Sequence, residues 1–412
     1  MKISYLIPEF PGQTHIWIWR EISHLREWGI EIDIFSTKRP SLNVKANHKF
    51  STDAEQETYY LWKQNLFNLF TDSFWAIFTH PLGFLKCIFL ALTINIDTRP
   101  KLRLTLPLIF ISCVLAREIS KRNIEHLHCH SCANSAILAM MVKRLTGTPY
   151  SLTLNANIEW WGGAMKEKFS DAKFTIAIAK WLFEQIQQDY PNLREEQVVL
   201  GRIGVDTKKW ICPTKNQHHR VFHIISVGRL HPSKGHIYLI QAVKSLVDLG
   251  EQIELTIIGA GSESENLMLL VNELQLSDTV QFIGSQSEEE IIKYMQQANA
   301  FVLSSHAEPL GVVYMEAMSM QLPTIGTNAG GVPEIISNGD DGLLVEARNH
   351  QALAEAIASL IRNPQLCLKL GQNARQKIIQ NFDSRIGAAT LYQCIFGSLP
   401  NDYLPLRATD VT

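Results

Sequence analysis

The chain has 412 residues, of which 46% are hydrophobic and 19% are charged, and its formal net charge is −2. This length accommodates two domains with sizeable cores, and the near-neutral charge excludes a general affinity for nucleic acid. Seven cysteines, an odd number scattered along the chain, make a poor disulfide framework and indicate a reducing compartment. We therefore expect a cytoplasmic protein.

The first half of the chain alternates short apolar runs with helical periodicity. Its N-terminal sequence, MKISYLIPEF, lacks the charged region and long apolar run of a signal peptide and predicts a first strand. Further strands are predicted over residues 30–37, 124–130, 150–154 and 174–179, and helices over residues 15–29, 133–147 and 181–190. Strands that alternate with helices of this length predict a parallel sheet covered on both faces.

An aromatic-rich helical region interrupts this alternation over residues 55–110. Its most apolar part, residues 75–94, has the length of a membrane span, but Pro81 and Lys86 argue against one. Three- and four-residue spacing predicts one apolar helical face, formed by Leu66, Phe67, Phe70, Phe74, Ile77 and Phe78. This face either packs in the protein core or lies peripherally on a membrane. In the second case four cations would add attraction to anionic lipid: Lys63, Lys86, Lys101 and Arg103.

The segment EHLHCHSC, residues 125–132, combines alternating histidines with a C-x-x-C spacing. On the predicted strand, His126, His128 and His130 share one face, because alternate residues of a strand point the same way. Zinc needs about four ligands, and the sequence has no second C-x-x-C or H-x3-H partner. We therefore expect no metal site, with zinc binding or thiol redox chemistry at Cys129 and Cys132 as alternatives to packed, hydrogen-bonded histidines.

The second half repeats the alternation more regularly. Strands are predicted over residues 223–230, 254–261, 279–285, 300–305 and 323–327, and helices over residues 236–250, 288–298 and 312–320. The polar run CPTKNQHHR, residues 212–220, separates the two alternating blocks. The predicted class is α/β, with doubly wound, Rossmann-like domains over residues 1–205 and 206–385 and a C-terminal segment over residues 386–412. Ligand sites of such sheets lie at the carboxyl ends of the parallel strands.

The densest polar cluster, HAEPLGVVYMEAMSM, follows the strand predicted over residues 300–305. Glu308 lies in the loop after that strand, and Glu316 lies one to two turns into the next helix. Between them, Leu310 and Gly311 mark the helix N-terminus, whose free N–H groups and dipole attract phosphate. Because carboxylates accept hydrogen bonds from vicinal hydroxyls, sugar and ribose are natural partners of this cluster.

Two further loops follow predicted strands. The loop GRLHPSKG supplies Arg229 and Lys234, two cations that suit a diphosphate. In the loop GAGSESE, Gly259 and Gly261 permit close approach of the backbone to a ligand. A dehydrogenase would instead need G-x-G-x-x-G after the first strand, which here ends in PEFPG, so we reject that class.

The G-R-x-x-x-x-K-G loop, the E-x7-E motif and the following NAGGVPEII together resemble the retaining nucleotide-sugar glycosyltransferases of family 4. The resemblance is strong over residues 223–345. It extends more weakly to YLIPEFPGQTHIWIWREI, which is similar to the polysaccharide-building branch of that family. The family implies the GT-B fold, in which two Rossmann-like domains face each other across a cleft and a C-terminal helix crosses back to the first domain.

The resemblance also implies roles for the residues that match its motifs. Arg229 and Lys234 would hold the donor diphosphate, Glu308 the donor sugar and Glu316 the ribose. Gly12 would lie against the diphosphate from the other side. The donor is a substrate, so no cofactor is expected, and two cations with a helix N-terminus can neutralise a leaving diphosphate without a metal.

A strand bearing H-x-H reaches the cleft in this family, which makes His130 a candidate for contact with acceptor or donor. Many relatives have a histidine after the strand that ends in SLTL, but this chain has Asn155. Asparagine cannot act as a general base, although it could orient a sugar hydroxyl. We therefore expect a retaining hexosyltransferase that acts on a saccharide or lipid-linked acceptor in exopolysaccharide or glycolipid synthesis. A glycosyltransferase-like binding subunit without turnover is the alternative.

Overall fold

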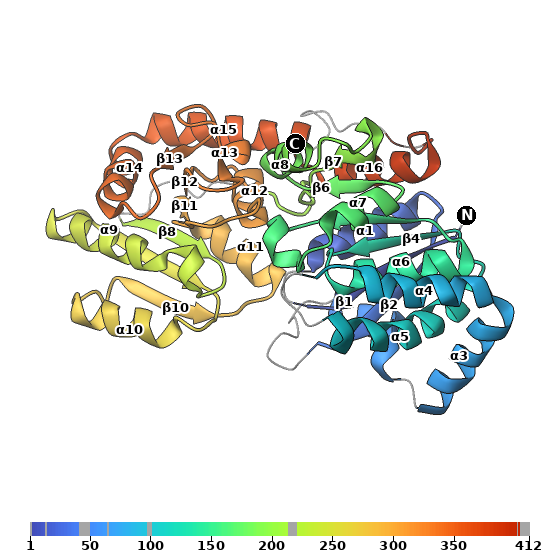
Figure 1. Ribbon diagram of the computed structural model, residues 1–412. Helices are drawn as coiled ribbons and strands as arrows, with labels where there is room; N and C mark the ends of the chain where they lie inside the picture. The colour runs from blue at the N-terminus through green and yellow to red at the C-terminus, as the bar shows by residue number, and fades with distance from the viewer. Residues whose placement is uncertain are drawn as a thin grey trace. The chain divides into compact units, whose positions relative to one another are not determined.

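The computed structural model describes residues 2–12, 15–40, 50–63, 66–96, 101–212, 221–401 and 403. Within these ranges the chain forms two compact units (Figure 1). The first comprises Met1–Arg202 and Ala388–Tyr403, and the second comprises Ile203–Gly387. The last nine residues of the predicted C-terminal segment lie outside the described part of the chain.

The first unit is built on a parallel sheet of seven strands in the order β3-β2-β1-β4-β5-β6-β7. Their bounds are β1 (Lys2–Glu9), β2 (Glu31–Lys38), β3 (Thr58–Tyr60), β4 (His126–His130), β5 (Tyr150–Leu154), β6 (Thr175–Ala177) and β7 (Val198–Leu200). Strands β4 and β5 are buried along their whole length, as expected for a parallel sheet with helices on both faces. In their register His128 lies opposite Ser151, and His130 lies opposite Thr153.

Helices surround this sheet. They are α1 (Ile16–Glu27), α2 (Phe50–Glu57), α3 (Leu66–Thr79), α4 (Pro81–Thr93), α5 (Lys101–Lys121), α6 (Asn134–Thr146), α7 (Met165–Asp171) and α8 (Lys180–Asp189). The short 3-10 helices of this unit are η1 (Leu61–Lys63), η2 (Ile158–Trp161) and η3 (Glu195–Gln197). The last helix, α16 (Ser384–Phe396), begins in the second unit and continues into the first.

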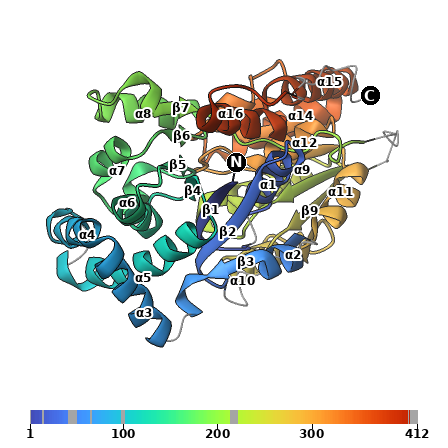
Figure 2. The same cartoon turned by 90° about the vertical axis from the view of Figure 1, so that its right-hand side faces the viewer.

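The aromatic-rich region forms α3, α4 and α5, which pack on one another while α4 and α5 also contact α6 (Figure 2). One face of α3 and α4 is buried here, and the opposite face leaves large apolar side chains exposed. In the described ranges no single helix is long and apolar enough to cross a membrane. The pair Phe67–Thr79 and Pro81–Thr93, bent by 113°, has the length and composition of a span only when the two helices are taken together.

The second unit contains a parallel sheet of six strands in the order β10-β9-β8-β11-β12-β13. The strands are β8 (Phe222–Val227), β9 (Ile253–Ile258), β10 (Val280–Gly284), β11 (Ala300–Val302), β12 (Thr324–Thr327) and β13 (Leu343–Val345). The helices are α9 (His236–Asp248), α10 (Ser264–Glu273), α11 (Glu288–Gln297), α12 (Val312–Ser319), α13 (Val332–Ile335), α14 (His350–Arg362) and α15 (Pro364–Asn381), with the short 3-10 helix η4 (Pro232–Lys234).

Both sheets therefore have the Rossmann-like, doubly wound organisation predicted from the alternation of strands and helices. The core of the second unit lies between its sheet and helices such as α9 and α14, where Leu239, Val243 and Ile357 pack against Leu255 of β9 and Val302 of β11. Loops at the carboxyl ends of the strands carry most of the predicted site residues. In sheets of this kind a ligand site lies at that edge.

Candidate functional site

In the second unit, two of the predicted donor-binding side chains form an ion pair. Lys234 lies in the loop after β8, and Glu308 lies in the loop after β11. The Lys234 ammonium donates a hydrogen bond to the Glu308 carboxylate, and both side chains are largely buried, with 15% and 8% of their surfaces exposed. The hydroxyl of Ser305 also approaches the Glu308 carboxylate at 3.4 Å. The structure thus brings together two residues that are 74 positions apart in the sequence.

Glycines allow these loops to approach each other closely. A Cβ atom at Gly235 would lie 2.2 Å from the carbonyl oxygen of Ser304, and one at Gly330 would lie 2.0 Å from that of Glu308. Gly261 similarly faces the carbonyl oxygen of Leu230, at 2.2 Å from an added Cβ. Gly261 of the GAGSESE loop therefore permits close contact between two loops of the protein. This contact alone is a sufficient reason for a glycine at position 261.

The residues between the two predicted carboxylates form the start of α12. Gly311 is the residue before this helix and has φ of 99°, a left-handed conformation that favours glycine. No side chain of the described residues caps the helix, so its first N–H groups face the loop uncapped. Leu310 is buried, and Glu316 lies in the second turn of α12 with partial exposure.

Cationic and imidazole groups gather at the same edge of the second sheet. Arg229 is exposed and makes no ion pair with the described residues. His306 follows β11, and its backbone N–H donates to the carbonyl oxygen of Ser233 at 2.9 Å. Burial and the nearby charges of Arg348 and His231 lower the pKa of His306. Arg229 therefore adds a positive charge that no described carboxylate pairs with, and this charge favours an anionic ligand.

His236 begins α9 directly behind this loop. It is buried, and neither of its ring nitrogens has a hydrogen-bond partner in the described structure. Burial, with a smaller contribution from Lys234, lowers the pKa of His236 to about 4. The ring is therefore neutral at pH 7 and adds no charge to the site.

In the first unit, His130 ends β4 within a network of polar side chains. Its Nε2 atom lies 3.2 Å from Glu21 of α1, and the hydroxyl of Tyr5 donates to the same carboxylate oxygen at 2.7 Å. Burial and the Glu21 carboxylate raise the pKa of Tyr5, which keeps the phenol protonated. The Nδ1 atom of His130 is buried and has no hydrogen-bond partner in the described structure. His130 therefore retains one ring nitrogen for a ligand or a water molecule.

The other two histidines of β4 are hydrogen-bonded within the sheet. His126 and His128 each approach the hydroxyl of Ser151 at 2.7 Å, and the second nitrogen of His128 approaches Thr153 at 3.0 Å. Burial lowers the pKa of His126 to about 3, with a further effect of Lys173. These two histidines are thus structural, neutral side chains of the core.

The same network contains the described cluster of possible metal ligands, formed by Glu21, His128 and His130. Because both nitrogens of His128 already bond to hydroxyls, the cluster falls short of the four ligands that zinc commonly takes. The thiols of Cys129 and Cys132 are buried, and burial raises the pKa of Cys132 to about 12. Neither thiol is thus poised as a thiolate for zinc or redox chemistry.

Asn155 and Gly12 follow the carboxyl ends of β5 and β1. The side-chain oxygen of Asn155 is buried without a hydrogen-bond partner in the described structure, so it can accept a hydrogen bond. The N–H of Gly12 donates to Nδ1 of His15 at 3.0 Å, which closes a tight turn. Burial, followed by repulsion from His130, lowers the pKa of His15 to about 4. The structure thus places Gly12, Asn155 and His130 at one edge of the first sheet.

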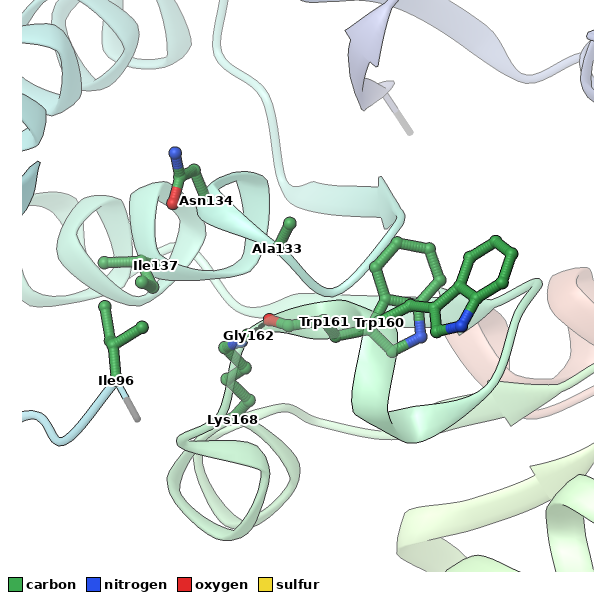
Figure 3. A pocket seen from close by; sticks show the side chains of 8 residues that line it. All are labelled: Ile96, Ala133, Asn134, Ile137, Trp160, Trp161, Gly162 and Lys168. Carbon is green, nitrogen blue, oxygen red and sulfur yellow. Dashed lines mark hydrogen bonds between the residues drawn. The ribbon is translucent and has the colours of Figure 1, made fainter. Parts of the chain in front are cut away.

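A small cavity of about 30 Å³ lies near this edge (Figure 3). The side chains that line it include Ile96, which follows α4, and the adjacent Trp160 and Trp161 of η2. The ammonium of Lys168 closes the cavity from below by donating to the carbonyl oxygen of Trp161 at 2.9 Å. Trp160 is nonetheless 73% exposed. The segment after α4 and the turn after β5 therefore share one pocket.

Glu21, His15 and His306 belong to these clusters but were not predicted from the sequence. Glu21 looks like an ordinary polar residue of the helix WIWREISHL, and only the fold brings it to His130. His306 stands two residues before Glu308, and its position directly after the strand predicted over residues 300–305 is a signal that would have included it. His15 stands three residues after Gly12, in the loop after the first strand. A rule that selects polar residues in loops after predicted strands would have included His15 as well.

Residues 213–377 match the family model of glycosyl transferases group 1. The matched residues make up most of the second unit. Among curated relatives, the chain is 29% identical over 234 residues to the amylovoran biosynthesis glycosyltransferase AmsK of Erwinia amylovora, covering 55% of this chain and 57% of AmsK. It is 33% identical over 165 residues to the capsular polysaccharide biosynthesis glycosyltransferase CapM of Staphylococcus aureus, covering 40% and 43%. The chain spans about half the length of these relatives.

The fold of the whole chain is also found among solved structures. The structure of HepE from Anabaena in complex with UDP superposes with a TM-score of 0.73 over 97% of this chain and 100% of HepE, at 18% identity. The structure of HepE with UDP-glucose has a TM-score of 0.72 over the same shares, at 17% identity. This likeness confirms the GT-B fold class that the sequence motifs implied.

Proposed function

We propose that the protein is a retaining glycosyltransferase that moves a hexose from a nucleotide diphosphate sugar to a saccharide or lipid-linked acceptor. The reaction would serve exopolysaccharide or glycolipid synthesis in the cytoplasm. The observation that carries the proposal is the ion pair of Lys234 and Glu308, with Arg229 in the same loop as Lys234, at one edge of a sheet that matches the group 1 glycosyltransferase model. The UDP and UDP-glucose in the HepE structures support a nucleotide diphosphate sugar as the donor.

Each group of the second unit has a role in this proposal. Arg229 and Lys234 would neutralise the diphosphate, helped by the uncapped N–H groups at the start of α12. Glu308 would accept hydrogen bonds from the donor sugar, and Glu316 from the ribose. Gly261, Leu310 and Gly311 would shape the backbone around the donor. Charge neutralisation by fixed groups is the main way such a site lowers the barrier to departure of the diphosphate, and no metal is invoked.

The proposed chemistry needs no protein base. An acceptor hydroxyl attacks the anomeric carbon on the face from which the diphosphate leaves. The bond from that carbon to the phosphate oxygen breaks, the bond to the acceptor oxygen forms, and the hydroxyl proton passes to the departing phosphate. In the first unit, Asn155 and Nδ1 of His130 are unsatisfied polar atoms that would orient the acceptor, with Gly12 close to the diphosphate.

A binding subunit without turnover is the second candidate, because Asn155 stands where many relatives carry a histidine. Titration calorimetry with nucleoside diphosphates and nucleotide sugars tests the donor site that both candidates share. Slow donor hydrolysis without acceptor separates them, since an enzyme leaks some sugar to water and a pure binder leaks none. Absence of binding by every nucleotide sugar would refute both candidates.

Variants divide the roles of the two carboxylates. Glu316→Ala is expected to weaken binding of the bare nucleotide. Glu308→Ala is expected to reduce discrimination among donor sugars while largely sparing the nucleotide. An equal loss of nucleotide affinity in both variants would contradict this division.

A further inference from the structure

The exposed side of α3 and α4 is mostly apolar. We define the apolar face as Phe67, Phe70, Phe74, Ile77 and Phe78 of α3 with Leu82, Leu85, Phe89 and Leu92 of α4. Phe78 and Leu82, which flank the bend between the helices, are 77% and 73% exposed. Such a large set of exposed apolar side chains on two adjoining helices is unusual on a soluble surface and marks an interaction site.

The hydroxyl groups and the one carboxylate of the helix pair are satisfied within the protein. The exposed hydroxyls of Thr79 and Thr93 donate to the carbonyl oxygens four residues earlier, at 2.6 and 2.8 Å. The one carboxylate of α3, that of Asp72, is buried and paired with Arg117. Water places no such demand on an exposed hydroxyl, whereas hydrocarbon does, because an unpaired polar group costs several kcal/mol there.

Charge on the apolar face points to the same partner. Residues 67–93 are all described, and the one exposed charged side chain among them is Lys86. A lone cation without any exposed carboxylate complements lipid headgroups, whereas a protein interface has a polar rim. We propose that the apolar face inserts into one leaflet of a membrane surface.

The geometry limits the depth of insertion. Each helix of the pair has about 13 residues and so is about 20 Å long, whereas a bilayer core is about 30 Å thick. The bend of 113° further prevents the two helices from forming a continuous span. The pair therefore enters as a wedge, with Phe78 and Leu82 at its tip. Its role in reaching a lipid-linked acceptor rests on the proposed function, but membrane contact itself does not.

Apolar area, rather than charge, drives this binding. The side chains of Lys63, Lys101 and Arg103, which were expected to add electrostatic attraction, lie outside the described part of the structure. Because the described apolar face has nine large exposed side chains and only Lys86 as a charge, neutral phosphatidylcholine vesicles are expected to bind the protein as well, and salt to have little effect. This differs from the dependence on anionic lipid expected from the sequence.

Co-sedimentation of the full chain with vesicles tests the proposal. The protein is expected to pellet with phosphatidylcholine, with or without added phosphatidylglycerol, at low and high salt. Phe70→Glu combined with Phe74→Glu should lower the partition coefficient about a hundredfold, because each buried phenylalanine contributes about tenfold or more. Phe78→Ser combined with Leu82→Ser at the exposed tip provides a second pair with less risk to folding.

Leu249→Glu is the matched control, since Leu249 is 73% exposed but lies in the second unit. It should pellet like the unaltered chain. The proposal would be overturned if the unaltered chain failed to pellet under every condition. It would also be overturned if both altered pairs pelleted as much as the unaltered chain. A dimer by analytical ultracentrifugation that the Phe78 and Leu82 changes dissolve would overturn it too, since a second copy would then cover the apolar face. Nucleotide binding in solution, measured on the same variants, reports separately on the proposed function.

Discussion

At the scale of single residues, the ion pair between Lys234 and Glu308 couples stability to ligand binding. Lys234→Ala should weaken binding of a nucleoside diphosphate by about 1.5–3 kcal/mol, the value of one charge-assisted contact. It should also lower the free energy of unfolding by about 3 kcal/mol, because Glu308 would remain buried without its counter-charge. Titration calorimetry and urea unfolding measure the two effects.

A second substitution separates these effects. Adding Glu308→Gln to Lys234→Ala should restore most of the stability but not the affinity. Arg229→Ala is the matched control, because Arg229 is exposed and has no ion pair among the described residues, so it should lose affinity without losing stability. Unchanged diphosphate affinity in Lys234→Ala would show that this loop does not hold the diphosphate.

His236 makes the second unit sensitive to acid. Its pKa is about 4 in the folded chain against an ordinary 6.5, so the unfolded chain binds the proton first. Stability is therefore complete above pH 6.5 and falls as the pH decreases toward 4, with a loss of about 2 kcal/mol at pH 5.

The variant His236→Leu should lose this dependence, since leucine removes a buried ring whose nitrogens have no partner. Hydrogen exchange of β8 and β9 at pH 7 and pH 5 reports on the second unit alone. This local measurement is needed because His15 and His126 have lowered pKa values in the first unit. A variant that loses as much protection at pH 5 as the unaltered chain would exclude His236 as the cause.

At the scale of elements, α4 lies unusually close to α6. A Cβ at Gly83 would lie 2.5 Å from the carbonyl oxygen of Arg144. The thiol of Cys87 donates to the carbonyl oxygen of Met141 at 3.4 Å. Gly83→Ala would normally stabilise a helix by about 0.5–1 kcal/mol. Here it should instead destabilise by about 1–3 kcal/mol, because a backbone carbonyl cannot move aside as a side chain can.

Thermal unfolding measures this change of sign. Leu85→Ala, on the exposed side of the same helix, is the control and should alter stability by less than about 1 kcal/mol. A higher melting temperature of Gly83→Ala would contradict the close packing of α4 on α6.

The long strands and helices were predictable from the sequence because their local patterns agree with the fold. The apolar runs that became β1, β8 and β9 are buried on both faces, and periodicity finds such runs easily. The strands β3, β7 and β13 have three residues each, too few to establish a pattern, and tertiary pairing alone defines them. The helical apolar pattern of α3 was recognised, but periodicity cannot distinguish a core-facing stripe from an exposed one.

The candidate site, like the fold, was predictable from the sequence only in part. Motifs located Lys234 and Glu308, but no local signal indicates that they pair with each other across 74 residues. The bond between His130 and Glu21 spans 109 residues and depends on the placement of α1 beside β4. Contacts of this kind arise from topology, so the sequence reveals the participants more readily than the arrangement.

At the scale of the whole molecule, the two units have separate sheets and separate cores. Donor binding by the second unit should therefore appear as a local change in the full chain. Hydrogen exchange with and without uridine diphosphate is expected to slow at residues 228–236 and 303–312, where loops follow β8 and β11. Helices α10 and α14 should exchange as before.

Lys234→Ala provides the control, since its exchange should respond less at the same nucleotide concentration. Protection confined to the first unit would contradict the assignment of the donor site to the second.

The pairing of Lys234 with Glu308 finally makes the site select for two features of a ligand at once. Inorganic phosphate can compete for the ammonium but offers nothing to the buried carboxylate, and a free sugar has the opposite shortcoming. Either would leave one buried charge unpaired, which is costly. A donor that carries phosphate and sugar together satisfies both charges in one event. The site would thus ignore the abundant single components of the cell without a steric barrier against either.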